Sequence, residues 1–513
     1  MQARIIAPAC PRQIQPRRPG ASTLLTTLCS FLILLSVLLL HTSVIYAGGS
    51  VDKGTSSQVA QYFESAKKNE ALLVAFLHKM PKGADLHNHP WGAVYTETLL
   101  DSAIAQNLVF DRTSRAFVKE TTNPCYTAQE LKQSNSKMGE VLSALSLRNQ
   151  PKEVENGHDH FFDSFGRFAA AVPSEEAMLR EQVGRAINQK ISYLELMTEP
   201  PREEEAIRIW LHQMDAARRE TIAQAGGIWN VDVAYIMPIN RNALPDSLKN
   251  GPWNQEVYEE FFTQEIRHAL STIVRFSDQG IRSLTFLDPE DSWISRTQFD
   301  TQMRILDREW RTLVAENPAN AAKLKVNLHA GELTLAYSPY EPMRNRISQS
   351  IALGHASRIG HGISIQWEDD VYSLLRQMRD HKTTVEICLT SNDGILNVAG
   401  GDKHPFRLYW DADVPVALCT DDEGISRSNL TMEYAKAAQW FGLSYGNLKW
   451  LAFSSLEYSY LPGESLFING DFNRPKTALP QGSAKALLEQ QLRHDFQRFE
   501  ANMEKNIQLM KNR

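Results

Sequence analysis

The chain has 513 residues, 42% of them hydrophobic and 22% charged, a composition ordinary for a soluble enzyme with two average domains or one large barrel. Its 54 Lys and Arg residues are outnumbered by 60 Asp and Glu residues, which gives a formal net charge of −6. Because nucleic-acid binding depends chiefly on clustered cations that neutralise phosphates, this balance disfavours nucleic acid as a partner or substrate.

The first 47 residues differ from the rest of the chain. Four arginines come before an apolar stretch that is densest from Phe31 to Leu40, and small residues follow from Ala47 onward. This order is typical of an export signal that is cleaved near Ala47. The segment from Leu24 to Tyr46 is also long enough to span a bilayer, so an uncleaved anchor is the alternative. Either interpretation predicts an exported catalytic part, periplasmic or secreted, with membrane contact only if the segment stays uncleaved.

Two amphipathic segments flank the central part of the chain. Residues 48–82 place apolar side chains such as Val59, Phe63 and Phe76 at helical spacing, which predicts an N-terminal helical extension. Residues 481–513 show the same spacing and predict a long C-terminal amphipathic helix.

Residues 83–480 contain short apolar runs that end in polar residues and are each followed by a helical pattern. Eight such units predict an α/β fold, a (β/α)8 TIM barrel. The runs are Gly83 to His89, Ile191 to Met197, Val231 to Ile239, Ile281 to Leu287, Leu324 to His329, Arg358 to His361, Thr384 to Leu389 and Val414 to Thr420.

The distance between the first and second runs is too long for one crossover helix. We therefore expect a long helical insertion at residues 90–190 that covers one end of the barrel as a lid. Its segment Phe161 to Phe168 carries aromatic residues at helical spacing. Core packing and substrate contact both remain open for these rings.

Three cysteines lie beyond the N-terminal segment: Cys125, Cys388 and Cys419. They do not form a disulfide framework. Because Cys388 and Cys419 each lie in an apolar run, we expect them to be buried thiols.

Polar residues that bind metals follow four of the predicted strands. His87 and His89 alternate along the first strand and therefore point to the same face, although two such histidines alone could be solvated or capping residues. The fifth strand ends at His329 and leads to Glu332, with Gly331 allowing a sharp turn between them. His361 lies between two glycines, which we expect to leave room for a ligand. Asp421 and Asp422 follow the eighth strand, where two like charges are costly without a cation or donors.

Because the carboxyl ends of barrel strands share one rim, strands one, five, six and eight would bring these motifs together. Three imidazoles and a carboxylate suit zinc, which keeps one position open for water in catalytic sites. The sequence lacks the His-x-Glu and Pro-Cys-x-x-Cys pattern of the cytidine deaminase group.

The same motifs, from about Lys82 to Leu430, resemble the adenosine deaminase family. The lead-in Met80-Pro81-Lys82-Gly83 is most similar to its secreted growth-factor branch. The resemblance implies one Zn²⁺ ion per chain and the following roles: His87, His89, His329 and Asp421 as metal ligands, Glu332 as proton donor, His361 as an aid to the attacking water, and Asp422 as a purine contact.

Two departures from the family pattern bear on the substrate. Trp91 follows the first motif where well-known members carry an Asp that contacts the sugar, and it could stack on a base or pack under the lid. Asp288 stands near the position of a glycine that lets the purine approach the backbone, so its side chain would narrow or repolarise the pocket.

Three functions follow as hypotheses, and they leave the oligomeric state open. The first is deamination of a small purine nucleoside, adenosine or 2′-deoxyadenosine, to the inosine compound and ammonia outside the cytoplasm. The second keeps the zinc chemistry but acts on another amino-purine or ring amine. The third is a secreted binding or signalling protein on a deaminase scaffold.

Overall fold

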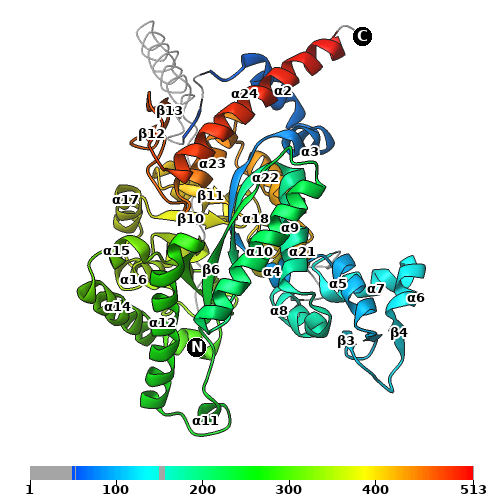
Figure 1. The fold of residues 1–513 in the computed structure, drawn as a ribbon, viewed down its shortest axis with the longest axis vertical. Coiled ribbons are helices and arrows are strands. Elements are labelled where there is room, and N and C mark those ends of the chain that lie inside the picture. Colours follow the sequence, from blue (N-terminus) through cyan, green and yellow to red (C-terminus); the bar gives the residue numbers. More distant parts are fainter. Residues whose placement is uncertain (1–48, 52–53, 149–155, 512–513) are drawn as a thin grey trace, which may run out of the picture. The chain divides into compact units, whose positions relative to one another are not determined.

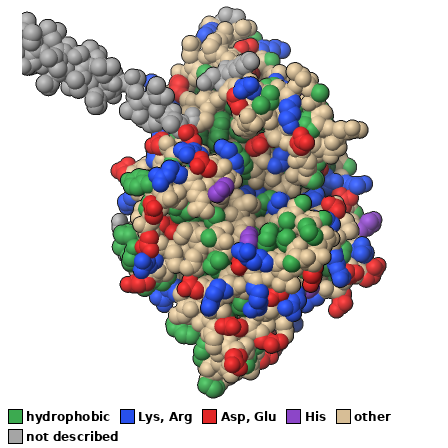
Figure 2. All heavy atoms as spheres, turned by 90° about the vertical axis from the view of Figure 1, so that its left-hand side faces the viewer, with side chains coloured by type: hydrophobic (Ala, Val, Ile, Leu, Met, Phe, Trp, Pro, Cys, Tyr) green, Lys and Arg blue, Asp and Glu red, His purple; other side chains and the backbone are tan. Residues whose placement is uncertain are grey.

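The computed structural model describes residues 49–51, 54–148 and 156–511, which belong to one compact unit, Gly48–Arg513. The expected signal or anchor at residues 1–47 lies outside the described residues. Within the described ranges, none of the helices is long and apolar enough to cross a membrane. Figure 2 shows Lys and Arg side chains interspersed with Asp and Glu side chains on the face it presents.

Eight parallel strands close into a barrel (Figure 1). They form two four-stranded sheets, in the orders β1-β5-β6-β7 and β11-β10-β9-β8, and each neighbouring pair is parallel. Isolated parallel bridges from Asn88 to Asp421 and from Leu284 to Val326 join the sheets at both seams. This arrangement confirms the predicted barrel. Its strands are β1 (Gly83–Asn88), β5 (Ile191–Met197), β6 (Asp232–Asn240), β7 (Ile281–Leu287), β8 (Asn327–Ala330), β9 (Arg358–His361), β10 (Thr384–Ile387) and β11 (Val416–Leu418).

The strands are buried on both faces because helices surround the barrel, which explains why their sequences read as near-continuous apolar runs. Each helix turns one apolar stripe toward the strands, as α12 does with Ile266, Leu270 and Ile273. The surrounding helices are α9 (Glu175–Gln189), α10 (Glu204–Gln224), α12 (Gln255–Phe276), α14 (Phe299–Glu316), α16 (Arg346–Ala352), α17 (Val371–His381), α20 (Phe406–Asp411), α22 (Leu430–Trp440) and α23 (Tyr445–Glu457).

Shorter helices occupy the loops between these elements. They are α11 (Asp246–Lys249), the 3₁₀ helix η2 (Ser277–Gln279), α13 (Trp293–Thr297), α15 (Asn320–Lys323), η3 (Ile363–Trp367), α18 (Leu389–Leu396), α19 (Gly400–Lys403) and α21 (Glu423–Ser426).

The insertion between β1 and α9 contains the expected helices and, in addition, a small sheet that the sequence analysis did not predict. It contains a three-stranded antiparallel sheet in the order β3-β2-β4. Phe110 and Phe117 pack edge to face within it, and Asp111 accepts the backbone N–H groups of Thr113 and Ser114 at the turn. Strands of three residues are too short to show periodicity in the sequence. The elements are α4 (Pro90–Ala93), α5 (Thr96–Ala105), β2 (Val109–Asp111), β3 (Ala116–Val118), β4 (Cys125–Thr127), α6 (Ala128–Gln133), α7 (Asn135–Leu145), α8 (Gly157–Phe168) and η1 (Ala169–Ala171).

The N- and C-terminal segments pack against each other. Residues 49–82 contain two helices, α2 (Ser57–Ala66) and α3 (Glu70–Lys79), because the Asn69 side chain accepts the N–H of Leu72 and starts a second helix. Phe76 of α3 packs on Phe499 of the long helix α24 (Ala484–Lys511), with ring centroids 5.2 Å apart. A hairpin of β12 (Phe467–Ile468) and β13 (Asp471–Pro475) precedes α24.

Lys82 fixes the N-terminal helices to the first strand. Its buried Nζ donates to the carbonyl oxygens of Leu77 at 2.6 Å, Met80 at 3.0 Å and Gln189 at 2.7 Å. Burial lowers the pKa of Lys82 well below its usual value. The amine thus satisfies carbonyl groups at the ends of two helices, α3 and α9.

Candidate active site

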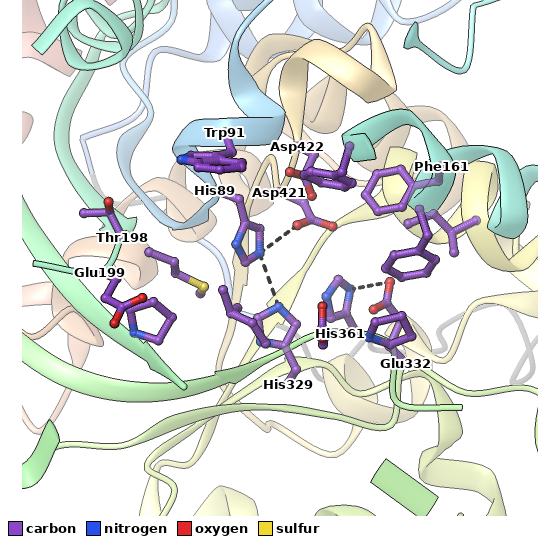
Figure 3. A pocket seen from close by; sticks show the side chains of 18 of the residues that line it. His89, Trp91, Phe161, Thr198, Glu199, His329, Glu332, His361, Asp421 and Asp422 are labelled. Atoms are coloured by element: carbon purple, nitrogen blue, oxygen red, sulfur yellow. Dashed lines mark hydrogen bonds and ion pairs between the residues drawn. The ribbon is translucent and has the colours of Figure 1, made fainter. Parts of the chain in front are cut away.

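The seven predicted site residues lie together at the carboxyl ends of β1, β8, β9 and β11. They surround a pocket with a volume of about 830 Å³, which His89, His329, Glu332, His361, Asp421 and Asp422 help to line (Figure 3). His87 lies beneath them and is fully buried. The strands that supply them are the first, fifth, sixth and eighth of the barrel, as the sequence predicts.

Three imidazoles and one carboxylate form a tight cluster in this pocket. His89 Nε2 lies 3.2 Å from His87 Nε2, 3.3 Å from His329 Nε2 and 3.1 Å from Asp421 Oδ1. His87 Nε2 and Asp421 Oδ1 are 3.6 Å apart. Four potential ligand atoms from three strand ends therefore converge on one point.

The protonation pattern of this cluster fits a metal cation. Glu386 Oε2 accepts the proton of His87 Nδ1 at 2.7 Å, which leaves a lone pair on His87 Nε2. His329 Nδ1 is similarly held 3.3 Å from the hydroxyl of Thr285. A cation held between these atoms would bind the imidazole lone pairs and the carboxylate oxygen together. The donor set suits a divalent transition metal.

A buried ion network supports His87 and was missed by the sequence analysis. The Arg358 guanidinium lies between two carboxylates, with Nε 2.6 Å from Glu386 Oε1 and Nη2 2.5 Å from Glu195 Oε2. All three side chains are at most 1% exposed. A carboxylate that holds the second nitrogen of a metal-binding histidine fixes its orientation and raises its basicity. The sequence offered one signal for this network, because Arg358, Glu386 and Glu195 are charged residues within predicted apolar strands.

The carboxyl groups in the pocket differ in protonation. Burial raises the pKa of Asp422 well above its usual value, and the adjacent charge of Asp421 adds to this effect. Burial and the charge of Asp421 also raise the pKa of Glu332 well above its usual value. For Asp421, burial acts upward, but the hydrogen bond from His89 and the nearby histidines lower the pKa well below its usual range. The pKa of Asp421 is thus shifted in the opposite direction from those of Glu332 and Asp422.

Three non-glycine residues at this rim have left-handed backbone conformations. The φ angles are 65° at His361, 61° at Asp421 and 84° at Asp288. Such conformations cost about 1–2 kcal/mol each for residues with a Cβ atom and persist where surrounding structure enforces them. All three also line the pocket, so the fold enforces these backbone conformations at its rim.

The glycines beside His361 have a different role from the one we expected. A Cβ atom on Gly360 would lie 2.9 Å from Cε1 of His87, and one on Gly362 would lie 2.5 Å from the hydroxyl of Tyr409. The space they leave is therefore filled by protein side chains and not by a ligand. Gly331 has a φ of 88°, which agrees with the expected sharp turn before Glu332.

The pocket has an aromatic wall and an acidic one. Phe161, Phe162 and Phe165 of α8 line it, while Phe168 of the same helix is buried in the core of the insertion. Trp91 also lines the pocket and is 49% exposed, so it does not pack in the core under the lid.

The acidic wall consists of Glu175, Glu199 and Asp288. Among the described residues that line the pocket, Arg202 is the one lysine or arginine. Its Nη2 is already 2.5 Å from Glu265 Oε2. The lining thus offers carboxylates and little free positive charge.

Three buried polar atoms in the pocket have no hydrogen-bond partner among the described residues. They are Glu332 Oε1, His361 Nε2 and Asp422 Oδ1. Buried polar groups are nearly always satisfied in folded proteins. A water or a polar ligand in the pocket would satisfy these three atoms.

Comparisons with known proteins place this geometry in context. A family model described as adenosine deaminase matches residues 131–466. The adenosine deaminase of Enterococcus faecalis is 32% identical over 152 residues, which are 29% of this chain and 42% of that protein. The N6-methyl-AMP deaminase of Homo sapiens is 23% identical over 331 residues, 62% of this chain and 81% of that protein. A crystal structure of the Arabidopsis N6-mAMP deaminase has the same fold, with a TM-score of 0.51, 19% identity and coverage of 82% of this chain and 99% of that one.

Proposed function

Because the chain belongs to the adenosine deaminase family, we propose that it removes the exocyclic amine of adenosine or 2′-deoxyadenosine by hydrolysis. The products would be the inosine compound and ammonia. The observation that carries this proposal is the set of three unpartnered polar atoms, on Glu332, His361 and Asp422, beside the cluster of three histidines and Asp421. A purine ring and an attacking water supply the donors and acceptors that these atoms lack.

The metal in this proposal is zinc, one ion per chain, held by His87, His89, His329 and Asp421. These residues offer the imidazole nitrogens and carboxylate oxygen that zinc favours. When bound, zinc lowers the pKa of water toward about 7 and so makes a nucleophile available at neutral pH.

The surrounding side chains have distinct roles in the reaction. Attack at the amine-bearing carbon makes that carbon tetrahedral and moves electrons onto a ring nitrogen. Glu332, whose raised pKa favours its protonated form, donates a proton to that nitrogen. The C–N bond then breaks as the proton of the newly added hydroxyl passes to the amine, which leaves as ammonia while the ring carbon becomes a carbonyl; the first proton of the attacking water restores Glu332. Asp422, whose pKa is also raised by burial, shares a proton with another ring nitrogen. His361 holds the attacking oxygen.

The charge of the pocket supports a nucleoside over a nucleotide. A phosphate needs cationic or N–H partners, but the acidic wall of Glu175, Glu199 and Asp288 repels it, and Arg202 is paired with Glu265. The same carboxylates can accept hydrogen bonds from sugar hydroxyls. The relatives named N6-methyl-AMP deaminases act on a nucleotide. The proposed substrate of this chain differs from theirs because it carries no phosphate.

The test is turnover of adenosine, 2′-deoxyadenosine, adenine, AMP and N6-methyl-AMP by the purified protein, followed by ultraviolet absorbance. We expect the highest kcat/KM with the nucleosides. A Glu332→Gln variant should lose about 10²- to 10⁴-fold in kcat with unchanged zinc content, while the exposed Glu341→Gln should behave as wild type. A preference for AMP or N6-methyl-AMP would overturn the nucleoside assignment.

A second candidate, deamination of another amino-purine, is favoured by Asp288 and Trp91. Both residues line the pocket, Asp288 near the position where the family pattern has a glycine and Trp91 where that pattern has a sugar contact. Turnover of an amino-purine other than adenosine would support this candidate. Bound zinc without turnover of any amine would instead favour a binding or signalling role.

We also propose that the chain is exported. The support is the order of residues in the N-terminal segment, with arginines before the apolar stretch from Phe31 to Leu40. Fractionation of expressing cells and mass spectrometry of the purified protein test this. Export with a new N-terminus near Ala47 indicates a cleaved signal, and membrane-bound intact protein indicates an anchor.

A further inference from the structure

A hydrogen-bond chain connects a backbone N–H group to the ring of His361. The N–H of Phe406 donates to His404 Nδ1 at 3.1 Å. His404 Nε2 lies 3.2 Å from Asn392 Oδ1, and Asn392 Nδ2 lies 3.0 Å from His361 Nδ1. Asn392 is completely buried and His404 is 3% exposed.

The direction of each bond follows from the first. A backbone N–H can only donate, so His404 Nδ1 must accept and carries no proton. Burial lowers the pKa of His404 to about 3, so the ring is neutral and its proton is on Nε2. That proton is donated to Asn392 Oδ1, which fixes the orientation of the amide. Asn392 Nδ2 therefore donates to His361 Nδ1.

This hydrogen-bond chain leaves only one ring nitrogen of His361 that can carry the proton of the neutral ring. Because Nδ1 accepts from Asn392, the proton of the neutral ring must be on Nε2. Nε2 is buried and has no hydrogen-bond partner among the described residues. Glu332 Oε1 is 3.6 Å from Nδ1, too far to replace the bond from Asn392.

The direction of donation along this hydrogen-bond chain cannot be reversed without placing two N–H donors opposite each other. A proton on His361 Nδ1 would meet the N–H of Asn392. If the amide rotated, its N–H would meet the N–H of His404, and the other tautomer of His404 would meet the N–H of Phe406. Burying a donor without an acceptor is unfavourable, so the observed directions are the stable ones.

We propose that Asn392 and His404 are positioning residues that hold His361 as the Nε2–H tautomer, so that His361 donates a hydrogen bond to the attacking oxygen and does not act as a general base. The catalytic consequence rests on the proposed deamination. The tautomer itself follows from the hydrogen bonds alone.

The first measurement is the tautomer of His361 in the zinc-loaded full-length protein by ¹⁵N NMR with labelled histidine. The signal is assigned by its loss in a His361→Gln variant. We expect a protonated Nε2 and an unprotonated Nδ1. A protonated Nδ1 at neutral pH, as the other tautomer or as imidazolium, would overturn the proposal. This outcome does not depend on turnover, so failure of the deamination assay is a separate result.

Variants then test the positioning role. Asn392→Asp replaces the donor with an acceptor, so we expect the His361 proton to move to Nδ1 and kcat to fall about 10- to 100-fold with little change in KM. Asn320→Asp is the matched control, because Asn320 is a buried amide that donates to the Leu313 carbonyl away from the pocket. An unchanged tautomer and kcat in Asn392→Asp would refute the role.

Substitutions at His404 test whether it transmits the direction of hydrogen bonding from Phe406 to Asn392. In His404→Gln the amide can accept from Phe406 and donate to Asn392, so we expect the wild-type tautomer and most of the kcat. His404→Leu removes both functions and should allow both tautomers of His361, with a loss of kcat. Equal behaviour of the two variants would contradict a relay through His404.

Discussion

Replacement of Gly92 by alanine tests whether Asp422 must occupy its observed position. A Cβ atom at residue 92 would lie 1.6 Å from Asp422 Oδ1 and 2.4 Å from its Cγ, whereas contacts under 3.0 Å essentially never occur. Gly92 has an ordinary helical backbone in α4, so alanine strains only the contact. The carboxyl group must therefore move by about 1.4 Å. A displacement of about 1 Å at a catalytic site can cost about 10²-fold in rate, so we expect kcat/KM for adenosine to fall by at least that factor.

The assay compares kcat/KM, zinc content and melting temperature in Gly92→Ala and in a matched control, Gly184→Ala. Gly184 lies within α9, and a Cβ atom there would meet nothing within 4 Å. We expect the control to keep wild-type activity and to gain up to about 1 kcal/mol in stability from helix propensity. If Gly92→Ala keeps full activity, then Asp422 is not a purine contact in the observed position.

Three further predictions concern the backbone, the pH dependence and the thiols. Asp288→Gly should release a left-handed conformation (φ 84°) and open the pocket, so kcat/KM should rise more for N6-substituted amino-purines than for adenosine; an unchanged ratio would contradict this. Burial, with the nearby charge of Glu457, raises the pKa of Glu489 to about 8 in the folded protein. Folding therefore favours the protonated form of Glu489. Its contribution to the free energy of unfolding is fully present below about pH 4.5 and is lost as the pH rises toward 8. Melting temperatures between pH 5 and 8.5 should fall less in Glu489→Gln than in wild type, in which this group contributes a slope of up to about 1.4 kcal/mol per pH unit. Cys125 should react with a thiol reagent in the native state, whereas Cys388 and Cys419 should react only after unfolding, as peptide mass spectrometry would show.

The barrel and the clustering of its motifs could be predicted because burial leaves a local trace in the sequence. A strand covered on both faces needs consecutive apolar residues, and Val414 to Leu418 shows this in one stretch. The polar residues that follow such runs must lie at one rim once the barrel closes. This reasoning located His87, His329, His361 and Asp421 without knowledge of any contact between them.

The supporting interactions leave no such trace. Arg358, Glu386 and Glu195 lie on three different strands, and nothing in one sequence says which buried charges meet. Asn392 lies in the short helix α18 and His404 directly follows α19, and their roles depend on the direction of hydrogen bonds. The small sheet of the insertion is held by cross-strand pairing of very short segments, which carries no periodic signal.

The seams of the barrel run beside the proposed metal site. In backbone strand pairing, single parallel bridges join the two four-stranded sheets, one from Asn88 to Asp421 and one from Leu284 to Val326, whereas side-chain bonds such as that between His87 and Glu386 join them elsewhere. His87 and His89 belong to the first sheet, while His329 and Asp421 belong to the second. An ion held by these four residues would thus cross-link the two halves of the barrel. Removal of the ion should then loosen the closure of the fold itself, and apo protein should exchange backbone amide protons of β1 and β11 faster than holo protein.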